Sequence, residues 1–587
     1  MKKTLTKDEI AETLESIALL MELKGENPFK SRAYTNAARA VETYAGDFMQ
    51  MARDGKLEEI AGIGKSIAEK LTVLVKTGKL PFYEELKAEF PASLFGLFEL
   101  QGLGAKKIKV LYEKLKVDSI EKLEVESKLG TVAALPGFGE KTAANILKSI
   151  EQLRQHAGEF RLGSVAHDAE KIADDLREHP DVIQVAVAGS YRRRKEVVHD
   201  LDFIVSTREP EAVSEFFVTH PLVESVQAKG PTKSSVRLKS GVQADIRVVT
   251  NEQYPFAIIY FTGSKEHNIV LRGRALQRGW TLNEYRIAPA ETKSKKEPEP
   301  IPKVRDETEF YQAFGLDFIP PELREDKGEF AAAEAHALPD LIELENLRGT
   351  FHNHTTASDG RSSLEEMAEA AQELGLQYLG IADHSKSSFQ AHGLSAKQLD
   401  EQVAQIKKLN ESYEGFRLFT GTECDILKDG SLDFPDEVLA QLDYVVASVH
   451  AVFNLSEAEM TKRIIRAMSN PYVTFLGHLT GRLLLKRDGY PVNHAAVIDA
   501  AAETGTIIEL NANPMRLDMD WRWWQLAKEK GVKCAINPDA HDTEGLQHLW
   551  FGVAAARKGW LTRKDVVNCL PLGEIEPVLA AKRKAKK

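Results

Sequence analysis

Seven short apolar runs recur between residues 350 and 541, and each of them ends in polar residues. The runs are TFHNH, YLGIADH, LFTGTE, VVASVH, VTFLGH, IIELNAN and CAINPDAH, with amphipathic helical patterns between them. Continuous apolar strands that alternate with helices are typical of a parallel sheet covered on both faces. Seven such units predict a distorted (β/α)7 barrel, in which reactive side chains gather at the carboxyl ends of the strands.

These strand ends carry nine side chains of the kinds that bind metal ions. Imidazole mixed with carboxylate suits Zn2+, Mn2+ or Fe2+ better than Mg2+, and nine ligands exceed the needs of one ion. A single histidine near a strand end is usually structural, which we expect of His392 and His494. The candidate metal ligands are His352, His354, Asp359, His384, Glu423, His450, His478, Asp539 and His541.

The motifs FHNHTTASDG, ADHS and NPDAH resemble the polymerase and histidinol phosphatase (PHP) domain, and every position of that family's ligand set is filled. The resemblance implies three ions of Mn2+ or Zn2+ and 3'-5' exonuclease activity, with AP endonuclease or 3'-phosphatase activity as further options. In such a site a metal-bound water attacks phosphorus near neutral pH. Arg482 and Arg516 are candidate phosphate clamps. The WRWW segment from Trp521 either stacks an unpaired base or packs in the barrel.

A second group of carboxylates lies in the middle of the chain. In VAVAGSYRRRKEVVHDLDFIV, Asp200 and Asp202 are two residues apart on an extended segment and point to the same side of a sheet. In GVQADIRVV, the alternation of apolar and polar residues puts Asp245 on the polar face of another strand. Three carboxylates on one face repel one another, and divalent cations such as Mg2+ relieve that repulsion. The layout predicts a two-metal phosphoryl-transfer site, whereas an isolated Asp-x-Asp is more often a solvated strand end.

Residues that can hold a polyphosphate flank these carboxylates. Gly189 supplies a turn, and the Ser190 hydroxyl and the Arg193 guanidinium can bind phosphate oxygens. The Gly-Ser turn, the Asp-x-Asp pair, the third Asp and the run YFTGS together resemble the palm and thumb of family X DNA polymerases. The resemblance implies these further contacts with an incoming deoxynucleotide: Arg161, Tyr260, Phe261, Gly263, Asn268 and Arg272.

The same resemblance implies the chemistry of the palm. Asp200 and Asp202 would hold two ions of Mg2+ or Mn2+, and Asp245 would hold the ion that activates the primer hydroxyl. The implied substrates are dNTPs and gapped or nicked DNA. The implied function is template-directed, gap-filling synthesis of the base excision repair type.

A glycine motif repeats in the N-terminal region, where IAGIG, LQGLG and LPGFG each precede an amphipathic helix. Glycines let the backbone approach closely, and free N–H groups at the following helix N-terminus bind phosphate without reading bases. The segments resemble helix-hairpin-helix elements, and the third copy either binds DNA or only caps a helix. The DNA-binding glycines would be Gly62, Gly64, Gly102, Gly104, Gly137 and Gly139.

Lys70 matches the position of the family's Schiff-base lysine, which removes a 5'-deoxyribose phosphate. That chemistry needs a lysine with a lowered pKa, aided by desolvation or by a neighbouring cation such as Lys65. A Glu69–Lys70 pair on a helix surface is more often simply solvated. Phosphate binding is therefore the alternative role for Lys70.

Length and charge bound the rest. A chain of 587 residues is too long for one core. The net charge of −11 means that any nucleic-acid surface is a local patch. No apolar run reaches the roughly 18 residues of a spanning helix, and three cysteines without a CxxC motif fit a reducing compartment. We expect a cytoplasmic, nucleoid-associated monomer with no membrane contact.

The expected domains follow the motifs along the chain. They are an N-terminal helix-hairpin-helix (lyase-like) domain at 1–85, fingers at 86–155, a nucleotidyltransferase palm at 156–250, a thumb at 251–325, a linker at 326–340, a PHP metal-dependent phosphoesterase domain at 341–575 and a basic tail at 576–587. The polar run 289–303 is expected to form an exposed arm of the thumb, and the end KRKAKK is expected to be solvated.

As a whole, the chain resembles the bacterial family X DNA polymerases that carry a C-terminal PHP domain. Two other functions stay open. One is a DNA-end-binding polymerase whose PHP domain is structural only. The other is a terminal-transferase-like enzyme, which usually needs an added loop between the palm strands, where this chain has only the short turn KSGVQ.

Overall fold

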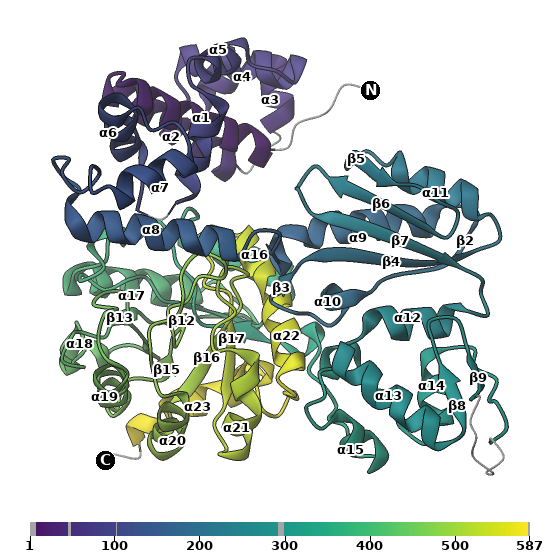
Figure 1. Ribbon diagram of the computed structural model, residues 1–587. Helices are drawn as coiled ribbons and strands as arrows, with labels where there is room; N and C mark the ends of the chain where they lie inside the picture. The colour runs from purple at the N-terminus through teal and green to yellow at the C-terminus, as the bar shows by residue number, and fades with distance from the viewer. Residues whose placement is uncertain (1–6, 45–47, 101, 291–298, 585–587) are drawn as a thin grey trace. The chain divides into compact units, whose positions relative to one another are not determined.

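A computed structural model of the chain (Figure 1) describes residues 7–44, 48–100, 102–290 and 299–584. The chain divides into two compact units, residues 1–157 and 158–587. No helix among the described residues is long and apolar enough to cross a membrane.

The first unit is entirely helical in its described part. Its helices are α1 (Lys7–Lys24), α2 (Pro28–Thr43), α3 (Phe48–Asp54), η1 (Leu57–Glu59), α4 (Lys65–Thr77), α5 (Pro81–Ala88), η2 (Ala92–Glu99), α6 (Ala105–Leu115), α7 (Ile120–Lys128) and α8 (Gly139–Gln155). They bury one apolar core, to which Leu14, Leu71 and Leu111 contribute with no exposed surface. The amphipathic stripes of short helices supply this core, because isolated helices of this length are marginal in water.

A five-stranded sheet with the order β2-β4-β7-β6-β5 begins the second unit. Its strands are β2 (Val182–Val187), β4 (Asp200–Thr207), β5 (Val223–Ala228), β6 (Lys233–Leu238) and β7 (Gln243–Val249). Helices α9 (Leu162–Glu178) and α11 (Pro210–Val218) pack on the face that carries Leu201, Phe203 and Val205. Because side chains alternate along β4, Asp200 and Asp202 lie on the opposite face.

A helical region follows the sheet. It contains α12 (Tyr254–Thr262), α13 (Lys265–Gln277), the hairpin β8 (Trp280–Leu282) and β9 (Ile287–Pro289), α14 (Glu307–Ala313), η3 (Pro321–Leu323) and α15 (Glu329–Glu334). The segment 326–340, which we expected to be a linker, contains α15, and this helix packs on α13. Glu329 is fully buried and lies 2.8 Å from His267, whose ring stacks on Phe330. Of the predicted arm, residues 291–298 lie outside the described residues.

Parallel strands alternate with helices through the C-terminal region, as the apolar runs predict. The strands are β10 (Gly349–Thr350), β11 (Tyr378–Ile381), β12 (Arg417–Thr420), β13 (Glu423–Asp425), β14 (Val446–Ser448), β15 (Phe475–Leu476), β16 (Ile507–Asn511) and β17 (Cys534–Asn537). The main helices between and after them are α16 (Leu364–Glu373), α17 (Ala396–Asn410), α19 (Glu457–Met468), α20 (His494–Thr504), α22 (Leu549–Lys558) and α23 (Leu572–Lys584).

The predicted barrel is not a continuous ladder within the described residues. The strands form one sheet of three and one of five, since the single run LFTGTE is split into β12 and β13. Isolated parallel bridges join His384 to Glu423 and Asn353 to Ala540 at the sheet ends. The strands therefore follow the order of a barrel. The two sheets are not joined by continuous ladders of hydrogen bonds, and the gaps lie next to the polar residues of the site.

The basic end of the chain also differs from expectation. Helix α23 buries Ile575 and Leu579 in the same core as Phe351. Lys582 Nζ donates to the Val473 carbonyl at 2.9 Å, so this lysine is docked rather than solvated. Residues 585–587 lie outside the described part of the chain.

Helix α22 joins the sheet of the palm to the C-terminal region. Its Trp550 and Phe551 pack against the core beneath the five-stranded sheet. At its end, the Lys558 ammonium is buried, donates to the Arg193 carbonyl at 3.1 Å and hydrogen-bonds Glu325. Both parts of the second unit therefore share apolar and ionic contacts.

Candidate active sites

Three aspartates lie together on the open face of the five-stranded sheet. Strands β4 and β7 are parallel neighbours, and their register places Asp202 beside Asp245 and Asp200 beside Gln243. Burial, together with the charges of Asp200 and Asp245, raises the pKa of Asp202 to about 7. Burial and the charge of Asp245 also raise the pKa of Asp200. Such mutual repulsion fits a site built for cations, and carboxylates are the ligands that Mg2+ prefers.

Lys233, on the neighbouring strand β6, was missed by the sequence reasoning. Its Nζ lies 2.8 Å from Asp245 Oδ2, and Gln243 Nε2 donates to Asp245 Oδ1 at 3.1 Å. Burial raises the pKa of Asp245, but the hydrogen bonds from Lys233, Ser235 and Gln243 outweigh burial and lower it. The available signal was the alternation in KSSVRL, which puts Lys233 and Ser235 on the same face of β6.

Gly189 has no room for a side chain. Its φ is +62°, and a Cβ atom there would lie 2.9 Å from Asp202 Oδ2. Ser190, the second residue of α10 (Gly189–Arg192), is half-buried next to this turn. The backbone of the turn therefore approaches the Asp202 carboxylate closely, which a side chain at position 189 would prevent.

The two arginines after this turn face the thumb. Arg192 Nη1 donates to Glu307 Oε1 at 3.0 Å and to Thr262 Oγ1 at 2.9 Å. Arg193 Nε donates to Glu325 Oε1 at 3.0 Å. Arg193 also hydrogen-bonds the carbonyl of Thr262, within YFTGS. The predicted triphosphate contact Arg193 is therefore already held by one ion pair and one backbone carbonyl.

The other predicted nucleotide contacts cluster along α12 and α13. Asn268 Nδ2 donates to the Tyr260 carbonyl at 2.7 Å, and the Arg272 guanidinium lies 5.9 Å from the centre of the Tyr260 ring. A Cβ atom on Gly263 would lie 3.1 Å from Arg193 Nη1, so the run YFTGS approaches the arginine closely. The Phe261 ring lies under the guanidinium of Arg247, with its centre 5.0 Å away.

Arg161 lies at the edge of the same region. It pairs with Val197 in a short two-stranded sheet, β1 (Phe160–Arg161) and β3 (Val197–Val198). Burial lowers the pKa of Arg161, and its Nη1 is buried without a hydrogen-bond partner. A buried donor without a partner is costly, which fits a group that receives an anionic ligand.

In the first unit, the glycine motifs start helices as expected, with one difference. Gly62 and Gly102 have positive φ, and Gly64 and Gly104 are the N-caps of α4 and α6. The third copy is different, because Gly137 and Gly139 both have positive φ and α8 begins at Gly139 itself. Lys70 Nζ donates to Ser66 Oγ at 3.0 Å and lies 5.0 Å from the centre of the Phe82 ring.

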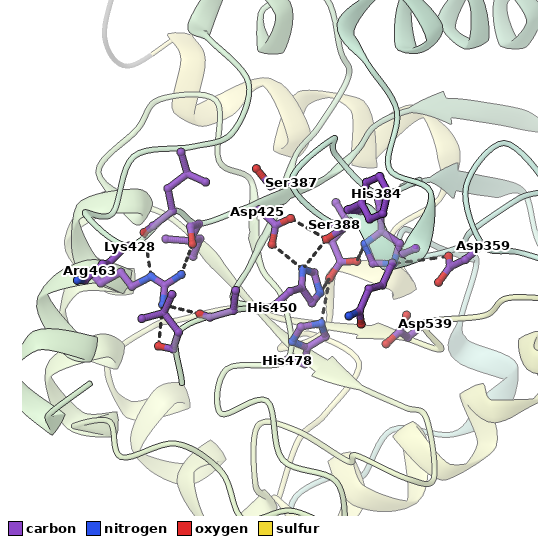
Figure 2. Close-up of a pocket in the computed structure, with 18 of the residues that line it drawn as sticks. Asp359, His384, Ser387, Ser388, Asp425, Lys428, His450, Arg463, His478 and Asp539 are labelled. Atoms are coloured by element: carbon purple, nitrogen blue, oxygen red, sulfur yellow. Dashed lines mark hydrogen bonds and ion pairs between the residues drawn. The ribbon is translucent and has the colours of Figure 1, made fainter. Parts of the chain in front are cut away.

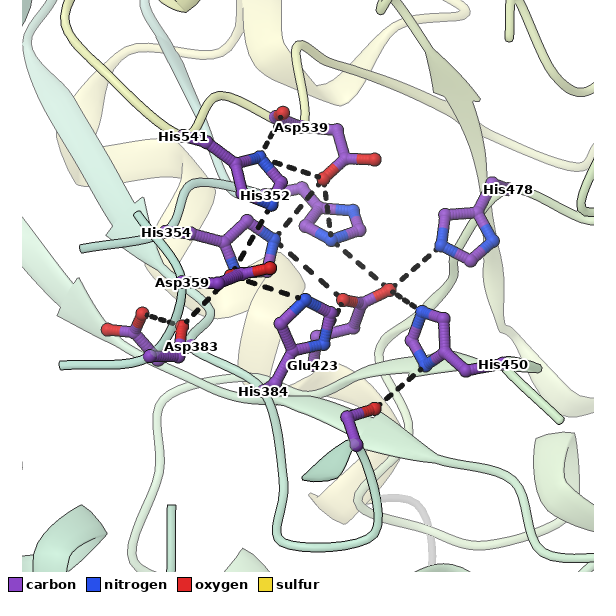
Figure 3. Close-up of polar contacts among 12 residues, drawn as sticks. His352, His354, Asp359, Asp383, His384, Glu423, His450, His478, Asp539 and His541 are labelled. Atoms are coloured by element: carbon purple, nitrogen blue, oxygen red, sulfur yellow. Dashed lines mark hydrogen bonds and ion pairs between the residues drawn. The ribbon is translucent and has the colours of Figure 1, made fainter. Parts of the chain in front are cut away.

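Nine ligand-type side chains meet at the carboxyl ends of the C-terminal strands (Figure 3). Eight of them form three groups, each of which could hold a metal ion: His354, Asp359, His384 and His541; His352, His354 and Asp539; and His384, Glu423 and His450. The ninth, His478, places Nε2 2.9 Å from Glu423 Oε1. Two histidines are shared between groups, so the three positions are adjacent.

Glu423 lies at the centre of this cluster. Its Oε1 is 3.3 Å from His352 Nε2 and 3.1 Å from His450 Nε2. Both carboxylate oxygens of Glu423 and both ring nitrogens of His354 are buried without a hydrogen bond. Burial raises the pKa of Glu423, but the surrounding imidazolium charges, His450 first, hold it well below its usual range. Buried lone pairs without donors fit metal cations, which would satisfy them.

Two carboxylates that orient these ligands were missed by the sequence reasoning. Glu509 Oε2 lies 2.7 Å from His352 Nδ1, and Asp425 Oδ1 lies 2.8 Å from His450 Nδ1. Such partners fix the tautomer and the direction of a ligating histidine. The signal for Glu509 was its place inside the apolar run IIELNAN, since a carboxylate buried in a strand needs a partner.

The two arginines predicted to bind phosphate and the WRWW segment lie in different surroundings. Arg516 Nε lies 3.3 Å from Asp539 Oδ2, and Arg516 lines the cavity above the cluster. Arg482 binds Asp520 and the carbonyl of Arg516, and it is not among the residues that line this cavity. The WRWW segment packs: Trp521 and Trp524 are buried. The ring between them in the sequence, Trp523, stacks on the His494 ring, with the two ring centres 4.6 Å apart.

Comparisons with known proteins agree with this layout. Family models match residues 6–80 (helix-hairpin-helix domain), 96–152 (SAM-like helix-hairpin-helix tandem), 257–325 (DNA polymerase beta thumb) and 350–513 (PHP domain). The DNA polymerase/3'-5' exonuclease PolX of Bacillus subtilis is 40% identical over 98% of this chain and 99% of its own length.

Two further matches cover part of the chain. A probable phosphatase of Thermoanaerobacter sp. is 31% identical over 40% of this chain and 94% of its own length. A crystal structure of Leishmania infantum polymerase beta in a ternary complex covers 40% of this chain and 98% of that chain, with 21% identity and a TM-score of 0.25.

Proposed function

The chain belongs to the bacterial family X DNA polymerases that carry a C-terminal PHP domain, and we propose that it fills gaps in DNA and trims 3' ends before filling them. The observation that carries the proposal is the 40% identity to a DNA polymerase/3'-5' exonuclease over 98% of the chain. Both sites are also complete in their ligand-type side chains. The polymerase would be template-directed and would use dNTPs on gapped or nicked DNA.

In the palm, Asp200, Asp202 and Asp245 would hold two divalent cations, which supply the positive charge for an in-line attack on the α-phosphorus. The chain itself would hold the triphosphate with the backbone at Gly189 and with the guanidinium of Arg193. Asn268 and Arg272, which line a small pocket with Tyr260, would test the shape of the new base pair.

In the PHP domain, the three ligand groups would hold metal ions, Mn2+ or Zn2+, which supply an activated water and spread the charge on phosphorus. Glu509 and Asp425 would keep His352 and His450 directed at those ions. Arg516 would bind a phosphate oxygen, since its guanidinium lies beside Asp539 and faces the cavity.

The test uses a gapped duplex with a mismatched 3' end. The Asp245→Ala variant should lose primer extension and keep trimming, whereas His352→Ala should lose trimming and keep extension of a matched end. Loss of the metal ions from one site should abolish the activity of that site and leave the activity of the other site unchanged. Two variants that each lose both activities would contradict the assignment of separate sites.

Three further activities are narrower proposals. AP endonuclease and 3'-phosphatase activities would use the same PHP metals, and the phosphatase option is supported by the probable phosphatase that matches this region. A 5'-deoxyribose phosphate lyase would use Lys70. A protein that shows no nuclease activity and that unfolds when its metals are chelated would instead favour a structural PHP domain, and extension of a blunt end without template would favour a terminal transferase.

A further inference from the structure

The cavity over the PHP metal ligands is larger than a phosphate group needs. It has a volume of about 640 Å3 (Figure 2). One part of its wall consists of ligands such as Asp359, His384 and His450, and another part consists of residues that bind no metal. The second part includes Phe389, Lys428 and Val452. Pockets of this size accommodate a whole small ligand, such as a nucleotide, rather than a single phosphoryl group.

Phe389 is the most exposed aromatic ring recorded around this cavity. Its exposed fraction is 86%, whereas large apolar side chains in this domain are mostly buried. It begins a short turn, η5 (Phe389–Ala391), that follows the loop carrying the ligand His384. A single exposed apolar side chain is common on proteins, so exposure alone decides nothing. The position on the cavity wall is what points to a ligand.

The loop that carries Phe389 is hydrogen-bonded to a carboxylate that also binds one of the candidate metal ligands. Ser388 Oγ donates to Asp425 Oδ2 at 2.6 Å, and the same carboxylate binds the ligand His450 through its other oxygen at 2.8 Å. The N–H of Ser387 donates to Asp433 Oδ2 at 2.8 Å. A Cβ atom on Gly393 would lie 1.9 Å from the Ser385 carbonyl, so the loop closes tightly on itself. The loop that carries the exposed ring is therefore held in place by hydrogen bonds and close packing.

We propose that Phe389 binds the base of the 3'-terminal nucleotide by stacking, which places the phosphodiester next to that base over the metal ligands. The inference rests on the proposed exonuclease function and adds the group that recognises the substrate. Every base has an aromatic face, so stacking on a phenyl ring tolerates all sequences. A mismatched or frayed end is already unstacked, whereas a paired base must first be pulled from the duplex. Phe389 would thus favour removal of mismatched ends.

The test compares two single-stranded oligonucleotides that differ only at the 3' end. One ends in thymidine, and the other ends in a tetrahydrofuran residue, which keeps the sugar and the phosphodiester but has no base. For the wild type, kcat/KM for removal of the last residue should be about 10- to 100-fold higher with the base than without it. In Phe389→Ala that ratio should fall to about one, with the tetrahydrofuran rate unchanged. Phe389→Trp should restore the ratio.

A matched control and a binding measurement complete the test. Leu374, at the C-cap of α16, is also exposed (48%) but does not line the cavity, so Leu374→Ala should keep the wild-type ratio. With metals chelated, the fluorescence of a 3'-terminal 2-aminopurine should be quenched by the wild type and not by Phe389→Ala.

Two results would overturn the inference. An equal loss of both rates in Phe389→Ala would show a structural role only. Unchanged ratios in that variant would show that the base is read elsewhere or not at all. A wild type that removes neither end, while its metals are bound, would instead overturn the exonuclease proposal itself and this inference with it.

Discussion

Glu307 is a half-buried carboxylate between two arginines. Arg324 Nη1 donates to its Oε1 at 2.9 Å, and Arg192, in the turn that begins at Gly189, binds both of its oxygens. Burial raises the pKa of Glu307, but the charges of Arg324 and Arg192 outweigh burial and lower it to about 2. The carboxylate therefore holds the turn of the palm against the thumb only while it is ionised.

This pKa shift predicts a pH dependence of stability. A carboxyl group with a folded pKa of about 2 and an ordinary value of 4.5 contributes stability above pH 4.5, which is lost as the pH falls toward 2. The full contribution is on the order of 3 kcal/mol. Thermal unfolding from pH 7 to pH 2.5 should show a smaller loss for Glu307→Gln than for the wild type. In the control Glu401→Gln, at an exposed pair with Lys397, the loss should match that of the wild type.

Strand β16 illustrates what a single element contributes to the metal cluster. Glu509 accepts hydrogen bonds from Asn511 at 2.9 Å and from Asn537 at 3.0 Å, in addition to its contact with His352. The strand therefore delivers a carboxylate that belongs to none of the three candidate metal groups but hydrogen-bonds His352, which belongs to one of them.

We expect Glu509→Gln to weaken metal binding about 10- to 100-fold, because His352 loses its charged partner. Titration calorimetry with Mn2+ should measure the loss, and primer extension should be unchanged because the palm does not use Glu509. Asn537→Ala, which removes one donor to the same carboxylate, should have a smaller effect. Equal Mn2+ affinity in Glu509→Gln and wild type would exclude the orienting role.

Elements whose function depends on alternation could be predicted from the sequence. Side chains alternate between the two faces along β4 and β7, which places Asp202 and Asp245 on one face. The apolar runs locate the strands that carry the histidines. What could not be predicted depends on contacts between distant elements. Arg482 looks like a free cation in the sequence but is bound to Asp520. Lys582 looks solvated but is docked on the Val473 carbonyl. Composition indicates the charge of a side chain and not its partner.

At the scale of the whole second unit, one buried lysine connects both catalytic parts. Lys558 is 1% exposed and reaches Glu325, which also binds Arg193, the proposed triphosphate contact. Burial lowers the pKa of Lys558 to about 8 in spite of the charge of Glu325. The Lys558 Nζ also lies 4.6 Å from the centre of the Trp521 ring. A residue of the PHP region thus completes the ionic surroundings of Arg193, which follows the Gly189 turn.

Lys558→Met should therefore affect polymerisation although it lies outside the palm. Breaking a buried ion pair by removing one partner costs about 3–5 kcal/mol, so the melting temperature should fall by several degrees. The KM for dNTPs should rise, because Glu325 then competes more strongly for Arg193. The exposed Lys564, changed to Met, is the control and should alter neither value. A lower melting temperature with an unchanged KM would limit Lys558 to a structural role.

The contact between the first and last strands of the PHP region has a kinetic consequence. The N–H of Phe351 donates to the Asn537 side chain at 3.1 Å, across 186 residues of chain. Bringing such distant segments together requires a large loss of chain entropy before any contact compensates for it. We therefore expect the cluster of histidines to form late during refolding, after these distant segments have met, and metal ions to bind only then.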